Sequence, residues 1–207
     1  MSSFNYKNGE LKIEGINLSE IAKKIKTPFY CYSYNHLKEQ YSKLDQSINL
    51  EDYHICYSIK SNSNQSIIKT FSKLGSGADV VSMGELKRAL KVGIPSQKIV
   101  FSGIGKSSEE IEFAIKNNIL MFNVESIGEL KKLSHVSSKL NIESQVALRI
   151  NPDIFLRLLY LVVSIQEAFL FSASCTFIRP ILGKLNSESS RICILIRSCF
   201  LFKCLMD

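Results

Sequence analysis

The sequence lacks the features that mark several large classes of protein. It has no C-x-x-C pair, and none of its three His has a Cys, His or acidic partner at the spacing of metal ligands. No run of Lys or Arg exceeds two residues, so the net charge of +7 indicates no nucleic-acid partner. The six Cys would allow three disulfides, as in a secreted protein. However, residues 1–13 have no apolar signal-peptide core, so nothing there indicates secretion. We expect a cytoplasmic protein without metal.

What is present indicates a folded chain with an internal break. The 207 residues are 45% apolar and 22% charged, which excludes a disordered or collagen-like chain. Residues 1–153 contain 18 Lys and two Arg, whereas residues 154–207 contain two Lys and four Arg, and 33 of those 54 are apolar. This shift is typical of a changed reading frame. We therefore expect a domain at 1–153 and a tail at 154–207 produced by a frameshift or truncation; the alternative is a second apolar domain or a membrane segment.

Short β-rich runs alternate with helical patterns in the first 153 residues. The predicted strands are His54–Ile59, Ala78–Val81, Ile99–Phe101, Leu120–Val124 and Val146–Ile150. A helix is predicted over Asn64–Leu74, with Gly75 after its end. Three later helices are predicted to begin at the Ser-x-x-Glu sequences of Ser82, Ser107 and Ser126, a pattern typical of capping boxes. The repeat predicts an α/β fold with a parallel sheet and right-handed crossovers.

Periodicity leaves open whether this sheet is doubly wound or part of a (β/α)₈ barrel. Two glycine-containing segments come close to nucleotide-binding fingerprints. Gly75–Gly77 lacks the third glycine because position 80 is Val, and Gly105–Ser107 lacks the first P-loop glycine because position 100 is Val. We interpret both segments as tight turns.

Lys60 follows the first strand, at the end where a β/α barrel carries its active site. A lysine facing a cavity there can have a depressed pKa and act as a nucleophile or Schiff-base former. The segment Tyr57–Asn62, read Tyr-Ser-Ile-Lys-Ser-Asn, resembles the Tyr-Ala-x-Lys-Ala-Asn motif of the group IV (fold-type III) pyridoxal-phosphate decarboxylases, with Ser at both Ala positions.

Four further blocks match this family in its order and spacing. They are Gly75–Leu86, Ile99–Lys106, Phe122–Ser126 and Arg149–Asp153. The resemblance covers residues 27–153 and is closest to the diaminopimelate decarboxylase branch.

The resemblance implies an alanine racemase-like (β/α)₈ barrel that binds pyridoxal 5′-phosphate, followed by a β-rich C-terminal domain, in a homodimer. Lys60 would hold the cofactor, Asp79 would lie close to it, and Arg149 would lie beneath its ring. The implied reaction converts a small amino-acid substrate, meso-2,6-diaminopimelate, to L-lysine and carbon dioxide, with the ring as electron sink.

After Asp153 the later blocks of the family are missing. We therefore expect a partial barrel without the C-terminal β domain, in which five strands leave two open edges, and no decarboxylation by this chain alone. The alternatives are an ornithine- or arginine-type decarboxylase, a non-catalytic regulatory protein, or a membrane-tethered binding protein. Membrane attachment is disfavoured because the apolar segment Leu158–Ile178 has Gln166 and Glu167 at its centre.

Overall fold

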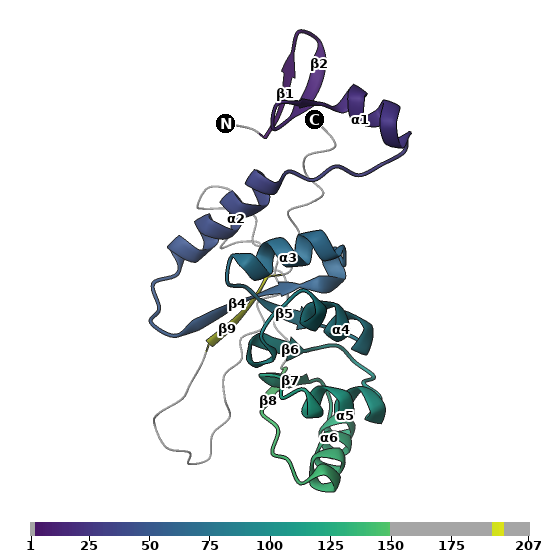
Figure 1. Cartoon of the computed structure of the whole chain (residues 1–207). Helices are drawn as coiled ribbons and strands as arrows, with labels where there is room; N and C mark the ends of the chain where they lie inside the picture. Colours follow the sequence, from purple (N-terminus) through teal and green to yellow (C-terminus); the bar gives the residue numbers. More distant parts are fainter. Residues whose placement is uncertain (1–2, 150–191, 197–207) are drawn as a thin grey trace, which may run out of the picture.

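The computed structural model describes residues 3–149 and 192–196, arranged in two sheets (Figure 1). The smaller sheet is antiparallel and contains β1 (Phe4–Lys7), β2 (Glu10–Ile13) and β3 (Ile16–Asn17). The larger sheet is parallel, with the order β8-β7-β6-β5-β4-β9. Its strands are β4 (Tyr53–Ser58), β5 (Gly77–Val80), β6 (Ile99–Phe101), β7 (Met121–Val124), β8 (Val146–Leu148) and β9 (Ile192–Ile196).

Two tight turns build the small sheet, for which the sequence analysis made no prediction. Asn8-Gly9 and Glu14-Gly15 are two-residue connections in which both residues have positive φ, the requirement of a type I′ hairpin turn. The small sheet leads into α1 (Leu18–Ile25) and then α2 (Tyr34–Ser47). The Glu14 carboxylate accepts hydrogen bonds from the Ser33 hydroxyl at 2.6 Å and the Asn35 amide at 2.8 Å, which attaches the small sheet to the start of α2.

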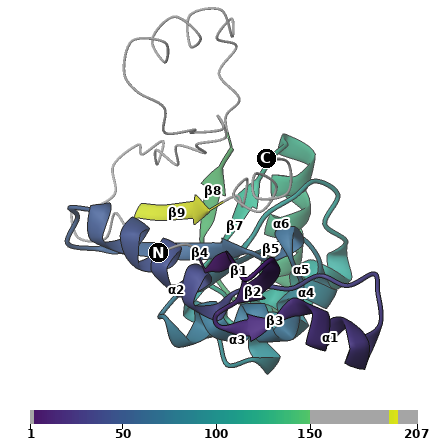
Figure 2. The same ribbon diagram turned by 90° about the horizontal axis from the view of Figure 1, so that it is seen from above.

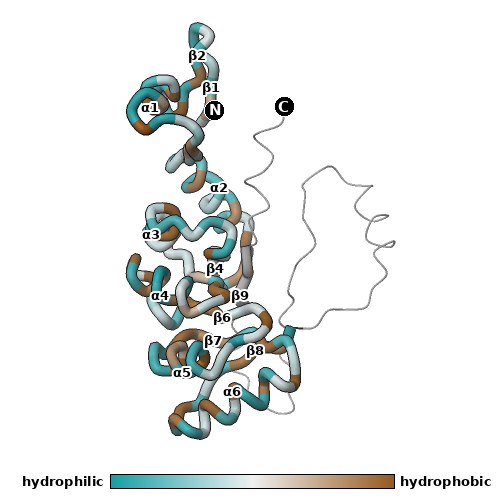
Figure 3. Tube along the Cα trace, turned by 90° about the vertical axis from the view of Figure 1, so that its right-hand side faces the viewer, coloured by the Kyte–Doolittle hydropathy of each residue, from teal (hydrophilic) through white to brown (hydrophobic). Residues whose placement is uncertain are grey.

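Four helices cover one face of the larger sheet (Figure 3). They are α3 (Gln65–Lys73), α4 (Met83–Lys91), α5 (Ser108–Lys116) and α6 (Ile127–Leu140), and short 3₁₀ turns η1 (Ile59–Ser61) and η2 (Ser96–Lys98) flank β4 and β6. Alternate strand residues such as Tyr57, Val80 and Phe101 belong to the main hydrophobic core with residues of these helices. Burial of this apolar face against the helices stabilises the layered arrangement.

The sheet topology decides between the two architectures left open by the sequence. From β4 to β8 each strand pairs with the next in the chain, and the connecting helices lie on the same face. A doubly wound sheet would reverse its strand order and carry helices on both faces. The chain therefore forms part of a (β/α) barrel, as expected. The predicted strands agree with β4 to β8 within two residues at each described end.

The expectation of two open edges is wrong on one side. β9 pairs in parallel with β4, with Ile194 opposite Ile55, and Figure 2 shows the two strands side by side. β8 forms the other edge of the sheet. The apolar segment Leu158–Ile178 lies outside the described residues. No helix in the part of the chain that the structure describes has the length and apolar character needed to cross a membrane.

Ser82, Ser107 and Ser126 are N-caps, as predicted, and each accepts a hydrogen bond from the amide three residues later. The reciprocal bond of a capping box forms only at Ser107. At the other two helices the Glu reaches the amide that precedes the cap: Glu85 bonds Val81, and Glu129 bonds Glu125. The backbone explains the difference, because φ is −156° at Ser82 and Ser126 but −75° at Ser107.

Candidate active site

Lys60 lies two residues beyond the end of β4, close to the strand end at which the sequence analysis placed it. The strand stops at Ser58, and Lys60 is the exposed middle residue of η1. The Ser61 hydroxyl donates to the Ser58 carbonyl at 2.7 Å, and the Tyr57 hydroxyl donates to the Asn62 carbonyl at 3.1 Å. These bonds close the turn and place the Lys60 amine at the carboxyl edge of the sheet, open to solvent.

Asp79 lies on the sheet face that points away from the helices. It is in register with Ser58 on the neighbouring strand, and residues in register on parallel strands share a face. The Ser58 hydroxyl donates to Asp79 Oδ2 at 3.2 Å. Ser58 is fully buried and Asp79 is 3% exposed. The bond therefore holds the Asp79 carboxylate on the inner face of the sheet, against the residue two positions before Lys60.

A second polar pair lies on the same face, on β7 and just after β6. Asn123 Nδ2 donates to the Ser102 hydroxyl at 2.8 Å. Asn123 is 2% exposed, and its Oδ1 atom has no hydrogen-bond partner among the described residues. A buried acceptor without a donor is costly, so this oxygen marks a place where a ligand or water donor would bind.

Arg149 follows β8 at the same carboxyl edge. Its Nη1 atom bonds Glu125 Oε1 at 3.2 Å, and the Gly103 amide donates to that same oxygen at 3.1 Å. The three residues singled out from the sequence, Lys60, Asp79 and Arg149, therefore share one edge of the sheet. Asp79 adjoins the strand that leads to Lys60, whereas β6 and β7 separate it from Arg149.

Glu85 was interpreted from the sequence only as a capping residue, but it also belongs electrostatically to this edge. Burial raises the pKa of Glu85, and the hydrogen bond from the Val81 amide opposes that rise. The Asp79 carboxylate raises the Glu85 pKa further, and the Lys60 ammonium lowers it. The available sequence signal was its position one turn after the strand that carries Asp79.

Lys106 was also missed as a buried group. The segment Gly105–Ser107 was interpreted as a tight turn; Gly105 has a φ of 81°, a conformation that favours glycine, but no hydrogen-bonded turn is formed there. However, the Lys106 side chain is buried and forms an ion pair with Glu129. A lysine amid glycines and serines carries no sequence signal of burial, because its partner Glu129 lies in α6, beyond the next strand.

The inner-face residues fit the pyridoxal phosphate that the resemblance implies. The Lys60 amine is accessible, Asp79 and Arg149 supply charges of opposite sign, and Asn123 Oδ1 offers a buried acceptor. This donor and acceptor set suits a charged aromatic aldehyde. Within residues 3–149 and 192–196, no group of three or more His, Cys, Asp or Glu is arranged to hold a metal ion.

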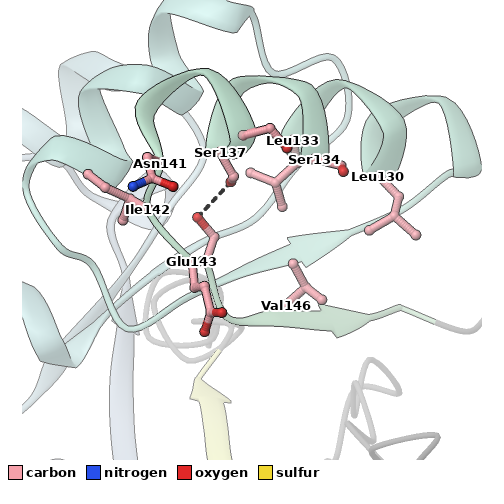
Figure 4. A pocket seen from close by; sticks show the side chains of 10 residues that line it. Leu130, Leu133, Ser134, Ser137, Asn141, Ile142, Glu143 and Val146 are labelled. Atoms are coloured by element: carbon pink, nitrogen blue, oxygen red, sulfur yellow. Dashed lines mark hydrogen bonds between the residues drawn. The ribbon is translucent and has the colours of Figure 1, made fainter.

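A hollow of about 500 Å³ lies away from this edge, between α6 and β8 (Figure 4). The Ser137 and Ser144 hydroxyls bond across it at 3.0 Å. Its lining is Leu130, Leu133, Ser134, Ser137, Ser138, Asn141, Ile142, Glu143, Ser144 and Val146. None of the candidate site residues contributes to it, so it is a feature of the sheet edge at β8.

Comparison with known proteins places the chain in a family. Residues 34–177 match the model of the pyridoxal-dependent decarboxylase pyridoxal-binding domain. The chain is 44% identical over 149 residues to the diaminopimelate decarboxylase of Aquifex aeolicus and 47% identical over 138 residues to that of Helicobacter pylori. These matches cover 72% and 67% of this chain but only 35% and 34% of the relatives, so the chain spans about a third of their length.

Solved structures agree. The Helicobacter pylori diaminopimelate decarboxylase complexed with L-lysine has a TM-score of 0.64 and 46% identity, covering 67% of this chain and 35% of that one. The enzyme from M. jannaschii has a TM-score of 0.70 and 37% identity, covering 75% and 37%. A lysine decarboxylase from Selenomonas ruminantium, at 24% identity, shares the fold. With its curled parallel sheet and Lys60 at the carboxyl edge, the chain belongs to the pyridoxal-dependent decarboxylase family and contains sequence of its pyridoxal-binding domain.

Proposed function

We propose that this chain is the cofactor-lysine part of a decarboxylase that converts meso-2,6-diaminopimelate to L-lysine and carbon dioxide. The observation that carries the proposal is the placement of Lys60 just past β4, beside the buried Ser58–Asp79 pair, at the carboxyl edge of a barrel sheet. The named relatives support the substrate, because they are diaminopimelate decarboxylases at 44% and 47% identity.

Each residue has a role that follows from its surroundings. When bound, pyridoxal phosphate supplies an electron sink for the charge left by departing carbon dioxide. The exposed Lys60 amine would hold the cofactor through its aldehyde group. The Ser58 hydroxyl holds the Asp79 carboxylate on the inner face, and Glu125 holds the Arg149 guanidinium at the carboxyl edge, where these two charges would hold the cofactor.

Activity measured with each candidate substrate distinguishes diaminopimelate from ornithine and arginine. A longer protein that continues residues 1–153 in the frame of the family should release carbon dioxide from meso-2,6-diaminopimelate and not from L-ornithine or L-arginine. The Helicobacter pylori relative holds L-lysine, the expected product. A higher kcat/KM for ornithine or arginine would replace the diaminopimelate assignment with the ornithine- or arginine-type activity.

We also propose that residues 1–153 are the barrel domain, that the tail at 154–207 comes from a frameshift or truncation, and that the complete enzyme is a cytoplasmic homodimer. Resequencing the locus tests the tail. A frame that is confirmed in independent reads, together with tail peptides detected by mass spectrometry in cell extracts, would overturn the frameshift.

Sedimentation of the complete enzyme tests the dimer, and cell fractionation tests its location.

Borohydride reduction tests Lys60 directly. The chain is incubated with pyridoxal phosphate, reduced and mapped by peptide mass spectrometry; we expect the pyridoxyl group on Lys60. The Lys60→Ala variant should lose the label, whereas Lys69→Arg, which alters an exposed lysine on α3, should keep it. A main label on another lysine would contradict the assignment.

The activity of this chain alone is a separate measurement. The described residues contain β4 to β8 but not the later blocks of the family, so residues 1–207 should release carbon dioxide from meso-2,6-diaminopimelate no faster than free pyridoxal phosphate does. Release above that rate would show that the missing blocks are dispensable.

A further inference from the structure

Lys106 is the most completely paired buried charge among the described residues. It is 3% exposed, and its ammonium donates to the carbonyls of Gly103 at 2.7 Å and Asn123 at 2.9 Å and to the Glu129 carboxylate. An ammonium group has three donor hydrogens, so each has an acceptor. The amine therefore joins the loop after β6 to the end of β7 and to α6.

The network continues from Glu129 toward Arg149. Glu129 Oε2 accepts from the Glu125 amide at 3.1 Å. The Glu125 side chain in turn holds Gly103 and Arg149 through its Oε1 atom. The backbone of Glu125 is thus tied to the Lys106–Glu129 pair, while its carboxylate faces the candidate site.

This arrangement goes beyond what stabilisation of the fold requires. An ion pair buried at the base of a loop would stabilise the loop without reaching a site residue. Here the buried pair reaches a site residue through Glu125 Oε1, the atom that holds Arg149. Glu129 binds the backbone amide of Glu125, and Lys106 binds the carbonyl of Gly103, whose amide donates to Glu125 Oε1. We call this series of contacts, from Lys106 and Glu129 through Glu125 to Arg149, the relay. The Arg149 side chain is kept in one rotamer only while every contact of the relay is intact.

We propose that Lys106 and Glu129 are positioning residues that act through Glu125 to hold the Arg149 guanidinium at the carboxyl edge of the sheet for the cofactor. The proposal rests on the proposed function for the place of the cofactor, but not for the relay itself. Loss of the pair releases Glu125 and Gly103, and Arg149 then turns toward solvent.

The relay is tested without cofactor by amide hydrogen exchange on residues 1–207. In Glu129→Gln and Lys106→Met, exchange at Gly103 and Glu125 should be at least about tenfold faster than in the unmodified chain. The matched control is Val136→Ala, which weakens the core face of the same helix without touching the relay. Equal acceleration in the control, or no acceleration in Glu129→Gln, would overturn the relay. Lys106→Met/Glu129→Gln, which leaves no unpaired buried charge, provides the measurement if Lys106→Met does not fold.

The link to the cofactor is tested by a double-mutant cycle on the dissociation constant of pyridoxal phosphate. Glu129→Gln and Arg149→Met should each weaken binding about tenfold, and the double variant should bind no more weakly than Arg149→Met alone. Additive losses would show that Glu129 does not act through Arg149. An unmodified chain that binds no pyridoxal phosphate would contradict the link between the relay and the cofactor in this chain, and the exchange measurement would still decide the relay.

Discussion

Polar residues on the inner face of the sheet are held in pairs, and each pair joins two neighbouring strands or their ends. Ser58 bonds Asp79 between β4 and β5, and Ser102 bonds Asn123 between the end of β6 and β7. Toward the amino ends of the strands the same face is apolar, with Cys56, Val100 and Leu120 packed together. The inner face thus changes from apolar to polar toward the edge that carries Lys60, which suits a site for a charged ligand.

Ser58→Ala tests the Asp79 pair. The substitution should lower the free energy of unfolding by about 1.5–3 kcal/mol, because a buried carboxylate loses a hydrogen bond. Urea unfolding measures the change, and Ser66→Ala is the control, since Ser66 is an exposed residue at the start of α3. The family motif has Ala at position 58, so the Lys60 label should survive in Ser58→Ala. A cost at position 58 no larger than at position 66 would contradict the role of the bond.

Replacement of glycine by alanine should change the stability of the chain in opposite directions at Gly77 and Gly84. A Cβ at Gly77 would lie 2.1 Å from the Lys98 carbonyl oxygen and 2.9 Å from Cys56 Sγ. At Gly84, in α4, the nearest atom would be 3.8 Å away. Gly77→Ala should therefore destabilise the chain by about 3 kcal/mol or more, and Gly84→Ala should stabilise it by about 0.5–1 kcal/mol. Thermal unfolding compares them; stabilisation at position 77 would refute the close contact.

At the scale of elements, side chains at the starts of the helices connect successive β/α units. Glu110 in α5 closes its own capping box through the Ser107 amide and also accepts from the Met83 amide at the start of α4, at 3.0 Å each. Glu125, just before α6, likewise accepts from the amide of Gly103 in the loop that precedes α5. The helices therefore keep a common spacing through side-chain to backbone bonds, besides packing on the sheet.

The pH dependence of stability tests the double role of Glu110. Burial alone would raise its pKa, but the hydrogen bonds from Met83 and Ser107 outweigh burial and lower it. A carboxyl group with a lowered folded-state pKa stabilises the fold above the unfolded value of about 4.3, and this contribution disappears as the pH falls through the folded pKa. Glu110→Gln should thus be less stable than the unmodified chain at neutral pH, with the difference shrinking in acid. Glu109→Gln, at an exposed residue of the same turn, is the control; a pH-independent difference at Glu110 would contradict the prediction.

At the scale of the whole molecule, the larger sheet is bounded by β9 on one side and β8 on the other. The β9 strand covers the backbone of β4, which would otherwise be an open edge available to another chain. Val146 and Leu148 of β8 are exposed, and Val146 also lines the hollow between α6 and β8. The described part of the molecule is thus more open at the β8 side.

Ile194→Pro tests whether β9 protects β4. Proline cannot donate to the strand pairing, so the variant should lose about 1 kcal/mol or more of unfolding free energy and scatter more light on heating. Lys203→Pro, outside β9, is the control. Identical unfolding and scattering of both variants would show that the β9–β4 pairing contributes nothing to stability.

Local sequence signals were enough to predict β4 to β8, α3 and the starts of α4 to α6. Each of these elements has a complete signal within a dozen residues: an apolar run, an amphipathic stripe, or a Ser cap followed by Glu. The family motif around Lys60 is also local. The small N-terminal sheet also has such a local signal, because Asn-Gly at positions 8 and 9 is typical of a two-residue hairpin turn.

The tertiary structure decided whatever depends on residues far apart in the chain. Strand order and the placement of helices on one face identified the barrel, because periodicity alone is the same in both architectures. The pairing of β9 with β4 joins segments more than 130 residues apart, which no local pattern encodes. Likewise, Lys106 and Glu129 resemble ordinary surface charges in the sequence. Only the approach of the loop after β6, the strand β7 and the helix α6 removes water from them and makes their pairing obligatory, since a buried charge without a partner is too costly to retain.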